Sequence, residues 1–391
     1  MAKIQAQPAL SATANQEAVR LRLFSFSIYS TMAVVVSYFP LYFHERGFTE
    51  QQIGILYAIG PALSIFANLI TGMVSDKYRT IRKIMTLLLA GQLILLATLL
   101  PVTDFIVVCF IMGAFYFFQT PVTPLNDSQI LLSVPHTGRS YPSIRIFGSL
   151  GFSVAALVIG LFLKSSGAGT TMIVCMITIG ISLALSFTLR DYQGSLRKIE
   201  FSGFFKLIRK PEVVAFFFLI MILSMVHRMN EGFLAIILRQ MGADESLIGF
   251  AWMASSASEI PVLYLLGRYG HKFKELPLLA IAALAYAARF WFLSEMTSPG
   301  WAILIQMMHS VSFGIFFPTA LRYLTVLIPD EFRASGQALY AVVWVGFAGL
   351  LSGTVGGSVL ELTGQETFFR LGIALSLLTA AGFIVTHLRT R

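Results

Sequence analysis

Twelve stretches of about twenty mostly apolar residues follow one another along this chain, and they limit the fold more than any other feature. A helix rises about 1.5 Å per residue, so each stretch can cross the roughly 30 Å hydrocarbon core of a bilayer. Charged residues make up only 12% of the chain, about half the usual share in soluble proteins. The sequence therefore excludes an ordinary soluble enzyme. It predicts an all-α membrane protein with twelve transmembrane helices near residues 22–43, 53–75, 84–101, 103–132, 142–163, 168–189, 212–238, 246–267, 276–294, 300–324, 337–360 and 366–388.

The longest polar segment within the chain divides these helices into two groups of six. We expect one half over 22–189, a cytoplasmic loop over 190–211 and a second half over 212–391. Residues 1–21 are polar, rich in Ala and Gln, and lack the apolar core of a signal peptide. They are interpreted as a disordered cytoplasmic tail.

The basic residues set the orientation. If the N-terminus lies inside, 21 of the 28 Lys and Arg residues fall on inward segments. Basic residues concentrate on the cytoplasmic side of membrane proteins, so both termini are expected in the cytoplasm of a cell-membrane protein. The net charge of +9 then reflects orientation, and no nucleic-acid partner is expected. The seven exceptions are Arg46, Lys164 and Arg239 in outward turns, and Arg145, Arg228, Arg289 and Arg370 within spans.

The two halves repeat each other at a nearly constant spacing. A shift of 195 residues places Gly47, Glu50 and Gly54 on matching residue types, as a shift of 198 does for Gly148 and Gly151. The matching residues are Gly242, Glu245, Gly249, Gly346 and Gly349. Two six-helix repeats in parallel resemble the major facilitator transporters, whose solute site lies between the halves near the midplane.

The loop after the second span carries a motif of the same family. Gly72, Asp76, Lys77 and Arg82 resemble the major facilitator loop signature, in which the Gly allows close helix approach and the charges gate the cytoplasmic side. Arg79 stands where a Gly is usual. The alternative is an ordinary basic cytoplasmic loop that contains an Asp.

Within that superfamily the chain is most similar to the subgroup of lactose permease, nucleoside–proton symporters and phenylpropionate permeases. The resemblance is carried by Asn126-Asp127 and, eighteen residues after Asp127, by Arg145 in a segment that ends at Phe152. It implies that these four residues line the solute cavity. Phe152 replaces the sugar-stacking Trp of lactose permease, which weakens the expectation of a galactoside.

Helix geometry leads to the same two charges. A hairpin that turns near His136 places Asp127 nine residues before the turn and Arg145 nine residues after it. At about 1.5 Å per residue they lie at the same depth, roughly 13 Å from the turn. A charge at that depth costs about 2.5–3.5 kcal/mol, so it is expected to be paired or to face a cavity. A purely structural salt bridge is the alternative.

The second half carries another group of intramembrane polar residues. Arg228 and Asn230 are expected to bind solute, and His227 and Glu231, one helical turn apart, are candidates for proton coupling.

Three more residues follow from the resemblance. Lactose-permease-like proteins use a Glu on helix eight, an Arg on nine and a His on ten, and Glu259, Arg289 and His309 look like those positions. This implies Arg289 and His309 for solute binding and Glu259 as the proton carrier. The carboxylate that lactose permease keeps one turn after the His is Ser312 here, and the basic residue one turn before it is Gln306.

The predicted function is a secondary active transporter, not an enzyme. Its expected partners are a lipid bilayer, a proton as coupling ion, and a small polar or anionic organic solute: a sugar, a nucleoside or an aromatic acid. We expect symport by alternating access, a monomer, and neither cofactor nor metal. The alternative is a proton-coupled drug or metabolite exporter. Against export, helix five lacks the late Gly-Pro typical of such exporters, since its Pro is Pro142 at the start.

Overall fold

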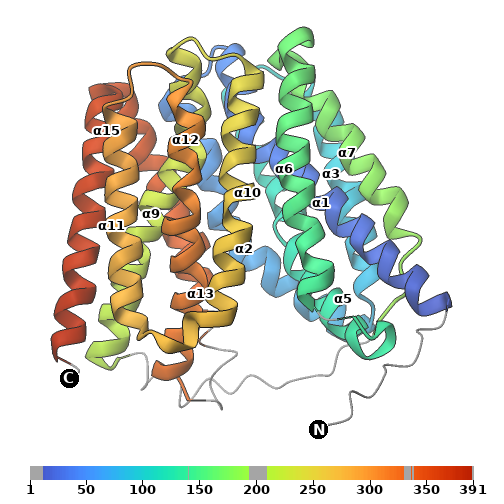
Figure 1. The fold of residues 1–391 in the computed structure, drawn as a ribbon. Coiled ribbons are helices and arrows are strands. Elements are labelled where there is room, and N and C mark those ends of the chain that lie inside the picture. The colour runs from blue at the N-terminus through green and yellow to red at the C-terminus, as the bar shows by residue number, and fades with distance from the viewer. Residues whose placement is uncertain (1–11, 140, 193–208, 330–335, 337–338, 390–391) are drawn as a thin grey trace, which may run out of the picture.

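The computed structural model describes residues 12–139, 141–192, 209–329, 336 and 339–389, and these residues form a bundle of long helices (Figure 1). The helices are α1 (Ala12–Glu45), α2 (Glu50–Tyr78), α3 (Ile81–Leu99), α4 (Phe105–Gln119), α5 (Val122–Thr137), α6 (Tyr141–Ser166), α7 (Thr171–Ser186), α9 (Pro211–Gln240), α10 (Glu245–Tyr269), α11 (Glu275–Ser294), α12 (Trp301–Met307), α13 (His309–Leu327) and α15 (Ala348–Arg389). Two short 3₁₀ turns, η1 (Ala168–Thr170) and η2 (Gly270–Lys272), and the π-helix η4 (Val342–Phe347) complete the described elements.

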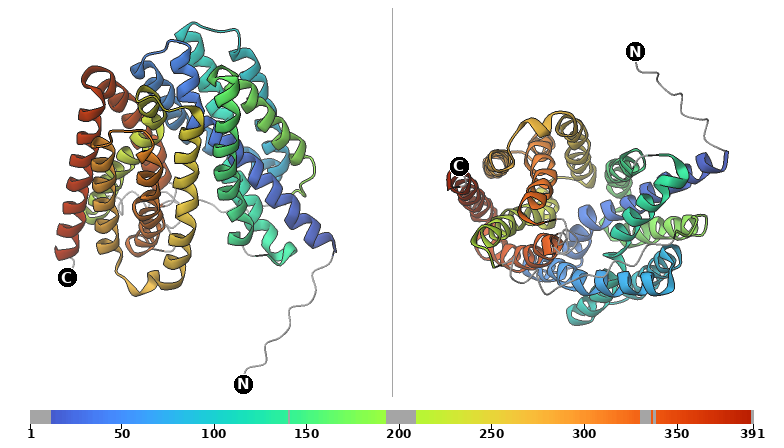
Figure 2. Two further views of the ribbon diagram at one scale, coloured as in Figure 1. Left: turned by 45° about the horizontal axis from the view of Figure 1, so that its top comes forward. Right: turned by 90° about the horizontal axis from the view of Figure 1, so that it is seen from below.

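The helices pack as two groups that meet along a seam. Helices α1 to α7 pack among themselves, and so do helices α9 to α15. Two sets of contacts form most of the seam: α2 packs against η4 and α15, and α6 packs against α10. Helix α1 also contacts α9. The view from below shows the two groups side by side (Figure 2).

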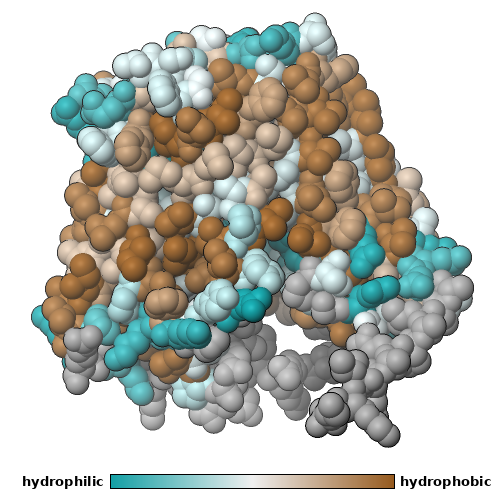
Figure 3. Space-filling model, viewed as in Figure 1, coloured by the Kyte–Doolittle hydropathy of each residue, from teal (hydrophilic) through white to brown (hydrophobic). Residues whose placement is uncertain are grey.

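Ten helical segments among the described residues are long and apolar enough to cross a membrane. Helix α10 is not one of them, although it has 25 residues, because its serines, Glu259 and Arg268 lower its hydropathy. The last of the ten, Leu339–Arg389, contains two helices that meet at Gly364, whose φ of 81° and ψ of 177° are not helical. Apolar side chains cover the middle of the visible face, and polar ones gather at its two ends (Figure 3). The chain is therefore a multi-pass helical membrane protein.

The prediction of a disordered tail over 1–21 is wrong for its second part, because α1 begins at Ala12. Ala, Gln and Glu in this stretch favour a helix. The first turns of α1 also have tertiary partners, since Arg20 donates to the carbonyl of Thr188 and Glu17 accepts a hydrogen bond from Tyr192. Residues 1–11 lie outside the described part of the chain, as do residues 193–208 of the predicted loop 190–211.

Two of the predicted spans contain an interruption. The span predicted over 103–132 is divided into α4 and α5 at Thr120 and Pro121, because proline has no amide hydrogen to donate. The span predicted over 300–324 is divided into α12 and α13 at Met308. An interruption leaves backbone N–H and C=O groups without their helical hydrogen-bond partners. Within the membrane, such groups occur only where protein or a water-filled cavity surrounds them.

The seam is closed at the end opposite the two termini. Helix α1 begins and α15 finishes at one end of the bundle (Figure 1). At the other end, Gly54 of α2 meets Gly353 of α15 so closely that a Cβ on either would overlap the other's carbonyl oxygen. Helices α6 and α10 also approach closely, because a Cβ on Gly160 would lie 2.5 Å from the carbonyl oxygen of Glu245. A Cβ on Gly249 would lie 2.5 Å from that of Ala156. Figure 3 shows a hollow between the halves toward the end that carries the termini.

Candidate functional site

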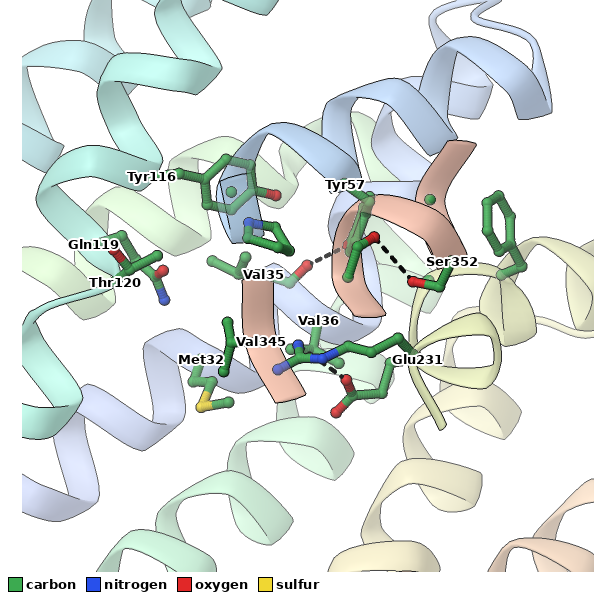
Figure 4. A pocket seen from close by; sticks show the side chains of 17 residues that line it. Met32, Val35, Val36, Tyr57, Tyr116, Gln119, Thr120, Glu231, Val345 and Ser352 are labelled. Carbon is green, nitrogen blue, oxygen red and sulfur yellow. Dashed lines mark hydrogen bonds and ion pairs between the residues drawn. The ribbon is translucent and has the colours of Figure 1, made fainter. Parts of the chain in front are cut away.

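A cavity of about 120 Å³ lies in the seam, and polar side chains from both halves line it. Gln119 and Thr120 lie on one side of it and Glu231 on the other (Figure 4). Arg228 and Tyr57 also line the wall, among apolar residues of α1 and η4. A small, mostly apolar cavity with few polar groups is typical of a solute site.

Irregular backbone borders this cavity on two sides. Thr120 stands at the break between α4 and α5, and its buried hydroxyl has no hydrogen-bond partner among the described residues. Opposite, η4 carries Val345 into the cavity wall. π-helical turns occur often at functional sites, because they widen the helix and turn side chains out of register.

The predicted pairing of Asp127 and Arg145 is confirmed. The Nε of Arg145 lies 3.4 Å from Oδ1 of Asp127, and their side chains are 29% and 31% exposed. The guanidinium also lies over the ring of Tyr29, 4.1 Å from its centroid. Gly148, one turn later in α6, makes room for it, because a Cβ there would lie 2.8 Å from the Arg145 guanidinium and 2.7 Å from the Tyr29 ring. Arg145 is thus held in place while part of the ion pair stays accessible.

Glu259 of α10 faces this ion pair from the opposite half. It has no ion-pair partner within 4.0 Å among the described residues, but it interacts electrostatically with Arg145. Its Cγ packs against Gly314 of α13. Arg145 therefore has a carboxylate partner in its own half and a second carboxylate across the seam.

A second charged group lies on α9. Oε1 of Glu231 is 3.4 Å from Nε2 of His227, and Oε2 is 3.3 Å from Arg228. His227 is buried, and the Tyr286 hydroxyl lies 3.0 Å from its Nδ1. One carboxylate thus balances one permanent cation and contacts one titratable ring.

Arg289 of α11 is the largest fully buried side chain among the described residues. It donates to Oε1 of Gln306 and, at 3.2 Å, to Nδ1 of His309. Both acceptors are uncharged, because a histidine that accepts at Nδ1 is neutral. Its Nε has no partner in the described part of the chain, and no carboxylate there lies within 4.0 Å. The structure therefore joins Arg289 to His309, as the resemblance implies, but it leaves Glu259 with Arg145.

Aromatic rings surround the two histidines. Phe313 stacks on His227 at 4.6 Å and on His309 at 4.9 Å between ring centroids. Trp344 of η4 lies 5.2 Å from His227. Across the seam, Phe152 of α6 meets the Trp252 ring edge to face at 6.3 Å. The predicted solute residue Phe152 is thus an aromatic contact between the halves.

The two predicted asparagines are both buried, in different settings. Asn126 is fully buried and exchanges hydrogen bonds with Ser25 of α1, so it ties α5 to α1. Asn230 is 3% exposed, and its Oδ1 has no partner among the described residues.

At the motif loop the structure corrects one expectation. Among the described residues, a Cβ on Gly72 would meet nothing within 4 Å, so the expected close helix approach is not found in this part of the chain. The reason is that the seam is closed at the other end of α2, where Gly54 lies. Arg79 has a φ of 51°, a left-handed conformation that explains why glycine is usual at this position. Lys77 lies over the Tyr78 ring at 5.6 Å, and the side chain of Asp76 is outside the described structure.

Arg82 is held by the end of the first half. Its guanidinium donates to the carbonyl of Leu189, and its backbone amide donates to Asp191. Asp191 also accepts from Thr80 and from the amide of Ile81, so it caps the start of α3. Sequence reasoning missed Asp191, since a lone Asp in a polar loop gives no signal of its distant partner.

Other residues near the site were also missed. Tyr29, Tyr286 and Trp344 contact the predicted residues, as described above, but each stands in an apolar helix where an aromatic side chain is ordinary. Trp344 offered the best signal, because the chain has only four Trp residues.

A helical bundle in two halves, with charged side chains facing a cavity in the seam, defines a membrane transporter. The model of the MFS_1 like family matches residues 18–371. The chain belongs to this family. It is a solute transporter and not an enzyme.

Known proteins of similar sequence are transporters. The chain is 27% identical over 355 residues to a maltose permease of Geobacillus stearothermophilus, with 87% of this chain and 86% of that protein covered. It is 23% identical over 367 residues to a probable 3-phenylpropionic acid transporter of Escherichia coli (strain K12), with 90% and 94% covered. It is 24% identical over 339 residues to a putative nucleoside transporter, YegT, of the same organism, with 82% and 79% covered.

Among solved structures, the nucleoside transporter NupG has the same fold. The TM-score is 0.82 at 18% identity, with 95% of this chain and 98% of that chain covered.

Proposed function

We propose that this protein is a proton-coupled symporter that imports a small polar or anionic organic solute by alternating access. The proposal includes twelve spans, obtained by counting α10 and by dividing α15 at Gly364. The halves are 22–189 and 212–391, joined by a loop over 190–211. Both termini lie in the cytoplasm of a cell in whose membrane the protein works as a monomer, with a proton as the only coupling ion and no cofactor.

One arrangement carries the proposal: α10, which bears Glu259, packs on α6, which bears Arg145, across the seam. About one turn from both charges, Ser256 donates to the carbonyl of Ser149, so Glu259 and Arg145 lie within electrostatic reach of each other. Arg145 is already paired with Asp127 in its own half. An ionised Glu259 attracts Arg145 and draws the halves together at this level, whereas a protonated Glu259 does not. Proton binding therefore changes the energy of bringing the halves together, which is what coupling requires.

The relatives support a small organic solute without selecting one. Their names specify maltose, 3-phenylpropionic acid and nucleosides, which differ in charge and in ring chemistry. A partly buried Asp–Arg pair offers both an acceptor and a donor, so it suits hydroxyl groups and carboxylates alike. In this proposal Asp127 and Arg145 hold the solute, Arg228 contacts it from the cavity wall, and Phe152 supplies an aromatic ring on the helix of Arg145.

The test is the variant Glu259→Gln in proteoliposomes with an imposed inward proton gradient. We expect it to lose accumulation of solute against a gradient but to keep exchange of solute across the membrane, because the amide resembles the protonated carboxyl. Glu366→Gln is the matched control, since Glu366 is 66% exposed and pairs with Arg370 at the surface.

Two outcomes would contradict the proposal. Unchanged accumulation in Glu259→Gln would exclude Glu259 as the proton carrier. Extrusion of lipophilic cations in exchange for protons, with no uptake of any solute, would make the protein an exporter.

A further inference from the structure

The intramembrane charges among the described residues do not all pair, and those left over are one anion and one cation. Asp127 pairs with Arg145, and Glu231 pairs with Arg228. Glu259 is left in the first group and Arg289 in the second. When Glu259 is ionised, the first group (Asp127, Arg145 and Glu259) therefore has a net charge of −1. The second group (Glu231, Arg228 and Arg289) has a net charge of +1.

In the described part of the chain, Arg289 has no counter-ion within 4.0 Å, although several groups surround it. Its own helix contributes Tyr286, α12 contributes Gln306, and α13 contributes His309. Ser312, one turn after His309, bonds to the carbonyls of Met308 and His309 and supplies no charge.

Glu231 of α9 influences Arg289 electrostatically but lies more than 4.0 Å from it. Its oxygens contact His227 and Arg228 instead. A buried guanidinium with only neutral acceptors is unfavourable, and an anion beside it removes that penalty. A carboxylate there would replace a neutral hydrogen-bond acceptor of Arg289 with a charged acceptor that can bind through both of its oxygens.

The two unpaired groups belong to the same half of the molecule, Glu259 on α10 and Arg289 on α11. Neutralising Glu259 with a proton leaves the site with a net charge of +1, and an anion at Arg289 restores neutrality. Binding of the proton and binding of the anion therefore favour each other.

We propose that the solute is a monocarboxylate whose carboxyl group binds Arg289, and that one proton on Glu259 accompanies it, so that transport is electroneutral. The inference rests on the proposed function and narrows its solute class. No covalent step is involved: the proton adds to one oxygen of Glu259 and leaves from the same oxygen on the other side.

The experiment uses the full chain in proteoliposomes and three pairs of solutes that differ by one carboxylate. They are phenylacetate and phenylacetamide, glucuronate and glucose, and orotidine and uridine. Uptake is measured with a pH gradient alone and with a potassium diffusion potential of either sign. One net charge moving through 100 mV changes the accumulation ratio by about fifty-fold. We expect accumulation of a carboxylate that the potential changes by less than about twofold.

The key variant is Gln306→Glu, which places a carboxylate beside Arg289 in nearly the same volume. It supplies the missing counter-ion internally, so the protein is expected to fold at least as well. Binding of the carboxylate is expected to fall by about 10–100-fold, the usual effect of losing a charged hydrogen bond. Arg370→Gln is the control, because Arg370 is 72% exposed and pairs with Glu366.

The outcomes separate this inference from the proposed function. Proton-driven uptake of a neutral solute that follows the membrane potential overturns the monocarboxylate and leaves the symporter standing. Unchanged carboxylate binding in Gln306→Glu overturns Arg289 as its site. Absence of proton-driven uptake for all six solutes overturns both.

Discussion

Two turns at the closed end of the seam have a similar backbone conformation but differ in their charged side chains. The turn after α1 and the turn after α9 each pass through a glycine at positive φ, 83° at Gly47 and 90° at Gly242. They are related by the shift of 195 residues. In each, a basic residue at the end of one helix faces a glutamate at the start of the next. The internal repeat is therefore visible as matched backbone geometry.

The basic residues of the two turns differ in how closely they approach their glutamates. His44 lies 4.0 Å from Glu50, at the limit of an ion pair. Arg239, its counterpart, lies 3.2 Å from Glu245 and also 3.2 Å from Glu45 of the other half. Most of the charge attraction across this end thus comes from one turn. The comparison teaches that the repeat kept the backbone conformation, while two side chains of the second turn, Arg239 and Asp244, made the closure asymmetric.

The largest effect on this difference between the turns is expected for Arg239→Gln. Glu245 is 4% exposed, so the change leaves a buried carboxylate without its partner and costs about 2–3 kcal/mol, less than for a fully buried pair. We expect a lower melting temperature and a larger separation of the halves at this end. Spin labels at Ser165 and Ser298 would report that separation as a population of longer distances. Arg239→Lys is the control, and an unchanged distance distribution in Arg239→Gln would exclude this role.

Alanine at the two turn glycines tests whether the backbones are equivalent. A Cβ at Gly47 or Gly242 would meet no atom of the described residues within 4 Å, so the positive φ is what opposes it. Each substitution is expected to cost about 1–2 kcal/mol and to lower the melting temperature equally. Gly169→Ala, with open space and an ordinary φ, is the control. A clear difference between Gly47→Ala and Gly242→Ala would show that the turns are not equivalent.

Lys164→Gln tests the ion pair between Lys164 and Asp244 at this end. Its effect on stability is expected to be smaller, because both side chains are exposed to water. Lys164 lies 2.8 Å from Asp244, and its hydrogen bond is the main reason that the pKa of Asp244 is about 2. The unfolded value is about 3.9, so this stabilisation is present above that pH and is lost as the pH falls toward 2. Melting temperatures at pH 5 and pH 2.5 are expected to differ less in Lys164→Gln than in the wild type. An equal difference would mean that the pair contributes nothing.

The smallest effect is expected at His44. At 4.0 Å from Glu50 its loss in His44→Gln should change stability by no more than about 0.5 kcal/mol. His44→Arg makes the first turn resemble the second and is expected to favour the closed arrangement, with fewer long distances between the same two labels. An increase in long distances would show that the turns cannot be made alike by this residue.

Local helix geometry was enough to predict one feature of the site. Asp127 and Arg145 stand at equal distances from the turn of a hairpin, so their depths could be calculated, and their ion pair is confirmed. His227 and Glu231, expected one turn apart on the same helix face, do lie within 3.4 Å of each other.

Contacts across the seam could not be predicted in this way. The sequence does not say that Glu259 interacts with Arg145 while Arg289 bonds to Gln306, because the rotation of α10 and α11 depends on how the halves meet. The interruption at Met308 was not predicted either, since no proline marks it.

The burial of Arg289 has a consequence for biosynthesis. An arginine opposes insertion of a helix into a bilayer by about 2.5–3.5 kcal/mol at the helix centre and by less toward the end, where Arg289 lies. Its acceptors Gln306 and His309 lie in the following span. At roughly 5–20 residues per second the ribosome completes that span within a few seconds. We expect α11 to enter the membrane only together with α12 and α13, as a hairpin. A nascent chain stopped after Ser294 should therefore leave α11 uninserted, and Arg289→Leu should insert it.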